Sequence, residues 1–198
     1  MYSVVTQTGG SRMYNKCVTD KAAAQQRKFE SAFLEMMKDR LFEDISISEL
    51  CRYTGLSRKT FYRLYETKGD VVYALIDHTI MEEATCEPDP TVGPGELHQF
   101  LAFWRSRKDL LDMLQKNQIS ALLSQQALNI ALQETPDRLV LFGLVGNANA
   151  RDMMLFYLSG LFALVLDWHG RGFDRTIDEV CDVMMELLSK TPIASLKK

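Results

Sequence analysis

Apolar residues near the start of the chain recur with the spacing of an amphipathic α-helix. They occupy positions i, i+3, i+4, i+7 and i+8, and the members of this stripe are Phe29, Ala32, Phe33, Met36 and Met37. Residues at these spacings share one side of a helix. The pattern therefore predicts a first helix that begins near residue 22 and packs through that side.

A second, shorter helix is predicted to begin at Ser46. Ser46 and Glu49 have the spacing of a capping box, in which each side chain satisfies an open backbone N–H group of the other residue. We expect this helix to end at about Thr54, because Gly55 follows and glycine adopts a tight turn at little cost.

Two further helices follow the turn at Gly55. Ser57 is a natural N-cap for a third helix over residues 58–65, and Thr67 caps a fourth. In the fourth helix three apolar positions at helical spacing mark the side that we expect to be buried, and they are Val72, Ile76 and Ile80.

Residues 86–96 contain three of the five prolines and two glycines, so we expect a loop and a domain boundary there. Helical patterns then return over 95–107, 108–117, 119–134, 138–146, 150–169 and 174–190, and no segment alternates like a strand. The prediction is an all-α fold with a flexible arm (1–21), a three-helix helix-turn-helix domain with its connecting fourth helix (22–85) and a helical bundle (86–198).

The composition describes an ordinary soluble globular protein, with 46% hydrophobic and 25% charged residues. Its net charge of −3 does not by itself suggest a nucleic-acid partner, and the distribution of charge is more informative. Residues 1–80 carry 12 Lys/Arg against 10 Asp/Glu, whereas the remainder carries 11 against 16. This asymmetry fits a small basic contact surface attached to a neutral or acidic body.

Several functional classes find no support in the sequence. The four cysteines never form a CxxC pair, and reduced thiols in a cytoplasmic protein are the simplest interpretation. No signal peptide is visible, and the 14-residue apolar run 153–166 is shorter than the roughly 20 residues that cross a membrane. His78, His98 and His169 are too far apart for a local metal motif. We therefore expect no metal, cofactor, catalytic centre or membrane partner.

The third helix divides into two faces. Phe61, Leu64 and Tyr65 are spaced to pack inward, which leaves an outward surface, here called the reading face, made of Arg58, Lys59, Tyr62 and Arg63. Three cations and a phenol are suited to a DNA major groove, because Arg and Lys reach guanine edges or phosphates and Tyr can donate to the backbone. A solvated cationic helix face is the alternative interpretation.

This stretch resembles the TetR/AcrR family of transcription regulators over about residues 27–80. The matching positions are Gly55, Ser57, Thr60, Tyr62, Tyr65, Thr67 and Lys68. The resemblance implies that Ser46 and Lys68 contact phosphates and that Arg58, Lys59 and Tyr62 lie in or beside the groove. With Ser57, Thr60 and Arg63 these residues form the predicted DNA-binding set. Lys59 stands where the family often has Gly or Ala, so the recognised sequence cannot be transferred.

The C-terminal half resembles this family more loosely, in residues 157–173, and is similar there to the dihydroxyacetone-kinase regulators. By analogy we expect a pocket for a small hydrophobic or aromatic effector, lined by Phe100, Phe103, Trp104, Met113, Phe142 and Phe156. Ordinary core packing is the alternative for each of these residues.

The helix over 150–169 is apolar nearly all round, and a helix buries only one side in its own domain. We therefore expect the last two helices to form a homodimer interface through Leu155, Leu158, Phe162, Val165, Ile177, Cys181 and Met184.

Together these patterns predict a homodimeric regulator, a repressor rather than an activator, that binds a pseudo-palindromic operator in double-stranded DNA and is released by its effector. The rival interpretation is a helical ligand-binding or co-activator module of the same fold that does not bind operator DNA.

Overall fold

The computed structural model describes residue 14 and residues 19–85, 95–133 and 149–190, and their regular structure is helical apart from one isolated β-bridge. The N-terminal elements are α1 (Asp20–Asp39), the 3-10 helix η1 (Phe42–Asp44), α2 (Ile47–Thr54), α3 (Arg58–Leu64) and α4 (Lys68–Thr85). The C-terminal elements are α5 (Glu96–Ser106), α6 (Lys108–Lys116), α7 (Ala121–Gln133), α9 (Ala150–Gly170) and α10 (Ile177–Lys190). The all-α prediction is confirmed.

Most predicted helix boundaries differ from the structure by one to three residues. The first helix begins at Asp20 because the hydroxyl of Thr19 accepts the backbone N–H of Ala22 and caps the helix there. The predicted helix over 138–146 and most of the loop over 86–96 lie outside the described residues.

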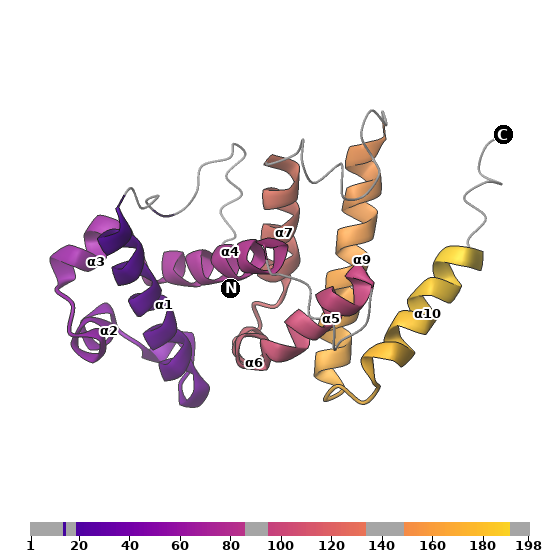
Figure 1. Ribbon diagram of the computed structural model, residues 1–198. Coiled ribbons are helices and arrows are strands. Elements are labelled where there is room, and N and C mark those ends of the chain that lie inside the picture. The colour runs from indigo at the N-terminus through magenta and orange to yellow at the C-terminus, as the bar shows by residue number, and fades with distance from the viewer. Residues whose placement is uncertain (1–13, 15–18, 86–94, 134–148, 191–198) are drawn as a thin grey trace.

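Helices α1, α2 and α3 gather at one end of the molecule, and α4 leads from them to the C-terminal helices (Figure 1). There α7 and α9 pack against each other, α10 packs on α5, and α6 contacts both α1 and α9. We call the group α1–α3 the N-terminal head.

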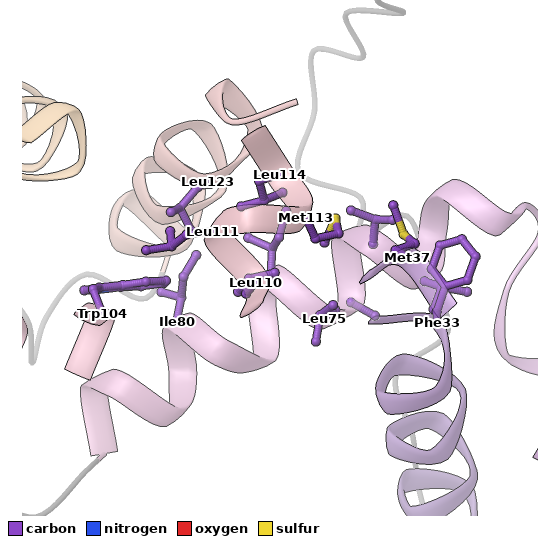
Figure 2. Close-up of a cluster of buried hydrophobic side chains, with 14 of the residues drawn as sticks. Phe33, Met37, Leu75, Ile80, Trp104, Leu110, Leu111, Met113, Leu114 and Leu123 are labelled. Carbon is purple, nitrogen blue, oxygen red and sulfur yellow. The ribbon is translucent and has the colours of Figure 1, made fainter. Parts of the chain in front are cut away.

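The head and the C-terminal helices share one hydrophobic core. Figure 2 shows Phe33 and Met37 of α1 and Leu75 of α4 beside the α6 side chains around Met113. The same buried cluster continues through α5, α9 and α10. Burying one such side chain stabilises the fold by about 1.5–3 kcal/mol. The boundary expected after residue 85 is therefore no break in the packing, since α1 and α4 bury apolar side chains against α6 and α7.

Helix α9 is long and apolar enough over Arg151–Gly170 to cross a membrane, judged by length and composition alone. One of its sides packs against α5, α6 and α7. Its composition is explained by that packing and by the exposed apolar face described below.

Candidate nucleic-acid interface

Both ends of α2 are built as the sequence predicts. The Ser46 side chain accepts the backbone N–H of Glu49, and the Glu49 carboxylate accepts the N–H of Ser46 at 2.9 Å, which completes the capping box. Gly55 ends α2 with a φ of 66°, in the left-handed region that other residues rarely adopt. These contacts fix where α2 begins and where it ends.

Helix α3 begins at a second cap. The Ser57 hydroxyl accepts the backbone N–H of Thr60 at 3.0 Å and lies 3.0 Å from the Thr60 hydroxyl. Both hydroxyls are thus already engaged in starting the helix, and this local role explains Ser57 and Thr60 without any ligand.

The two faces of α3 separate as predicted. Phe61, Leu64 and Tyr65 are buried, and Phe61 packs edge-on against Phe29 of α1 with ring centroids 5.4 Å apart. All residues of the reading face are exposed, including Tyr62 at 49%. A large phenol at this exposure has room to contact another molecule.

Two cations of the reading face, Arg58 and Lys59, have no acidic partner close by. Within the described part of the chain, no carboxylate lies within ion-pair distance of either side chain, and α3 contains no acidic residue. The Arg58 guanidinium lies over the Tyr62 ring, 6.0 Å from its centroid, and a hydrogen bond with Tyr62 raises the pKa of Arg58. Arg63 donates to Gln25 of α1 at 2.6 Å, which ties the other end of α3 to the first helix.

The structure gives Lys68 a different role from the phosphate contact that the family resemblance implies. Its Nζ donates to the carbonyl oxygens of Phe42, Glu43 and Ile45 at 2.8, 3.0 and 3.1 Å, and lies 4.5 Å from the centre of the Phe42 ring. An ammonium has three N–H donors. All three are used by the turn formed by η1 and Ile45, so Lys68 is a clamp between α4 and the turn before α2.

The same turn is held from the C-terminal helices. The side chain of Asn117, at the end of α6, accepts the backbone N–H of Phe42 at 2.7 Å. Lys116 donates to the carbonyl oxygen of Lys38 at 2.9 Å, near the end of α1. Sequence reasoning missed Asn117, because its partner is 75 residues away and no local pattern marks such a contact. The turn that precedes α2 is therefore fixed by α4 and α6 together.

The structure places the residues expected to line an effector pocket in different environments. Trp104 and Met113 are buried in the shared core, and Phe100 and Trp104 pack on Phe162 with ring centroids 5.5 and 5.2 Å apart. Phe103 is half-buried against Trp104. Among the described residues the indole N–H of Trp104 has no hydrogen-bond partner. A buried donor without an acceptor is uncommon in folded proteins.

Two other members of the expected pocket are not placed there. The prediction for Phe156 is wrong, because its side chain is 84% exposed on α9 and faces away from the core. Phe142 lies outside the described residues. Two open hollows in the described structure lie instead on the surface between α1 and α2, with volumes of about 460 and 390 Å³.

The predicted dimer interface also changes. Leu158, Phe162, Val165 and Cys181 are buried within the protomer, so they cannot form the contact surface expected of them. Burial raises the pKa of the Cys181 thiol to about 11, which keeps it protonated and unreactive at neutral pH. Leu155, Ile177 and Met184 are half-buried.

An exposed apolar face remains on the last two helices. On α9 it comprises Phe156, Ser159, Gly160 and Ala163, which recur at i, i+3, i+4 and i+7. On α10, Val183 and Met185 are 48% and 60% exposed. The inward stripe of α9 was mistaken for its outward one, because an almost uniformly apolar helix gives no sequence signal for which side faces the core.

The three histidines lie apart, each beside one carboxylate. His78 contacts Glu30 at 2.9 Å, His98 contacts Asp178 at 3.2 Å and His169 contacts Asp112 at 2.8 Å. Among the described residues no three His, Cys, Asp or Glu side chains cluster as metal ligands would.

No family model and no curated protein matches the sequence. Among solved structures, the crystal structure of Lin0861 from Listeria innocua is similar, with a TM-score of 0.59 and 16% sequence identity. The alignment covers 90% of this chain and 97% of that one. At this identity the likeness concerns the fold alone, and it extends over both the N-terminal head and the C-terminal helices.

Proposed function

We propose that this protein is a DNA-binding transcription regulator of the TetR/AcrR type, and a repressor. The observation that carries the proposal is the reading face of α3. Arg58 and Lys59 are exposed and have no carboxylate within ion-pair distance among the described residues. They stand on a short helix whose start, end and inner side are fixed by caps and aromatic packing. A pre-ordered helix of this kind loses little conformational entropy when it enters a major groove.

Recognition of a pseudo-palindromic operator requires two such helices, so the proposal includes a homodimer. The exposed face of α9 supports it, because Ser159 and Gly160 allow a second helix to approach closely while Phe156 supplies buried area. The last two helices of each protomer would form the interface, as expected, but through this outer face.

Release by a small hydrophobic or aromatic effector is the third element of the proposal. The orphaned indole N–H of Trp104 supports it, since a ligand acceptor could satisfy this donor inside an otherwise apolar environment. Asn117, at the end of α6, accepts a hydrogen bond from Phe42 of η1. This contact would connect a ligand bound beside α5 and α6 with the N-terminal head.

The test begins with duplexes selected from a random library for binding to the full-length protein. Fluorescence anisotropy then compares Arg58→Ala and Lys59→Ala on a selected and a scrambled duplex over a salt series. A cation that reads a base edge should lose about 1–3 kcal/mol on the selected duplex only. Arg175→Ala is the control, because it removes one exposed charge from the loop before α10.

The control variant should bind like the wild type. Failure to enrich any duplex, together with no binding at low salt, would refute the DNA-binding function. Equal losses on both duplexes would instead show that α3 only holds the backbone.

A further inference from the structure

Tyr14 precedes α1 in sequence but lies against the far end of α3. Its backbone forms an isolated antiparallel bridge with Tyr65, the residue that caps the C-terminus of α3. Tyr14 is half-buried and packs on the shared core. The expectation that residues 1–21 form a flexible arm therefore does not hold at this position.

The Tyr14 side chain continues from α3 to α4. Its hydroxyl donates to Asp77 at 3.2 Å, and its ring stands edge-on to His78 with centroids 5.7 Å apart. Tyr14 thus pairs with the end of α3 through its backbone and contacts two consecutive side chains of α4 through its own side chain.

A buried carboxylate lies beneath these contacts. Glu30 of α1 is only 1% exposed, and its oxygens accept from His78 Nδ1 at 2.9 and 3.0 Å and from the Tyr65 hydroxyl at 3.3 Å. Arg27 adds an ion pair at 3.3 Å. A buried carboxylate is costly unless its oxygens are hydrogen-bonded, so this cluster favours one arrangement of α1, α3 and α4.

Tyr14 contacts two of the three partners of that carboxylate, since it pairs with Tyr65 through the backbone and packs on His78 through the ring. Without the Tyr14 side chain, the end of α3 would keep the packing of Phe61, Leu64 and Tyr65 in the core. The backbone that bridges Tyr65 would, however, lose its attachment to Asp77 and His78 of α4. The expected consequence is greater local motion of the last turn of α3 rather than unfolding of the head.

We infer that Tyr14 is a positioning residue for α3, the helix that carries the reading face, and that it holds α3 at a fixed angle to α4. This inference rests on the proposed function. Contacts to base edges require one orientation of α3, whereas contacts to phosphates tolerate several. Loss of Tyr14 should therefore weaken binding to a selected duplex more than binding to a scrambled one.

The experiment uses the full chain with Tyr14→Ala and Tyr14→Phe. The alanine variant should lose about tenfold in affinity for the selected duplex, a difference of roughly 1.4 kcal/mol, and much less for the scrambled duplex. The phenylalanine variant keeps the ring against His78 and the backbone bridge, so it should recover most of the loss.

A stability control separates positioning from general destabilisation. Leu101→Val removes one methylene from a fully buried side chain of α5, remote in sequence from the head. It should lower the urea midpoint and leave the ratio of the two affinities unchanged. An unchanged ratio in Tyr14→Ala, or a similar change in Leu101→Val, would overturn the inference.

Hydrogen exchange tests the inference independently of DNA. In Tyr14→Ala the amide of Tyr65, which donates to Phe61 at 2.9 Å, should exchange faster while the α5 amides do not. If the wild-type protein bound no DNA, the proposed function would fail and this measurement would still decide whether Tyr14 holds the end of α3. Unchanged exchange at Tyr65 would refute that role.

Discussion

Replacing Lys68 with methionine distinguishes a structural clamp from a phosphate contact. Methionine is unbranched like lysine and can still lie against the Phe42 ring, but it has no ammonium group and no N–H donors. The variant would leave three carbonyl oxygens of the turn before α2 without their partner, those of Phe42, Glu43 and Ile45.

The size of the effect follows from the surroundings of those oxygens. The bond to Glu43 is exposed, so water replaces it at little cost. The bonds to Phe42 and Ile45 are partly buried, and each should contribute about 1 kcal/mol. The cation–π contact with the Phe42 ring adds about 0.5–1 kcal/mol. The expected loss of about 2–3 kcal/mol lowers the melting temperature by about 4–12 °C for a chain of this size.

The assay is thermal unfolding at one fixed protomer concentration, followed by DNA binding over a salt series, with Lys59→Met as the control. Lys59 is exposed on the reading face and should change the binding without changing the melting temperature. The clamp hypothesis would be refuted if Lys68→Met had the melting temperature of the wild type while the slope of log binding constant against log salt concentration fell by about 1 per lost phosphate contact.

Three further predictions follow from individual residues. Hydrogen bonds from the backbone and side chain of Ser46 lower the pKa of Glu49 from 4.5 to about 2. The stabilisation is therefore complete above pH 4.5 and lost as the pH falls towards 2, so the urea midpoints of wild type and Glu49→Gln should converge over that interval. Gly55→Ala should cost about 1 kcal/mol in urea unfolding, because alanine is strained at a φ of 66° although the space around it is open; an unchanged midpoint would contradict this. Phe156→Glu should yield folded monomers by light scattering, whereas Leu158→Glu, which buries a charge in the protomer, should lose helicity by circular dichroism. A dimer that survives Phe156→Glu would exclude this face as the interface.

Local features of the N-terminal head could be predicted from the sequence because their causes are local. A capping box, a glycine turn and a helix of two faces each depend on residues no more than four positions apart, and the structure contains all three. The apolar spacing of α4 correctly identified Val72, Ile76 and Ile80 as buried. Whether the reading face binds DNA stays a prediction.

Predictions for the C-terminal helices failed where the pattern held too little information. Nearly every position of α9 between Met153 and Leu166 is apolar, so periodicity could not indicate which side faces α7. Phe156 was assigned to the interior and Leu158 to the surface, and the structure shows the reverse.

The sequence by itself determined the all-helical class, the order of the helices and the local construction of α2, the turn and α3, because backbone capping and amphipathic spacing act over a few residues. Only the tertiary structure decided the role of Lys68, the hold of Asn117 on Phe42 and the docking of Tyr14 on α3 and α4. These contacts join residues 23 to 75 positions apart. Such pairs form because packing of the shared core brings a donor and an acceptor together, and no spacing along the chain encodes that approach.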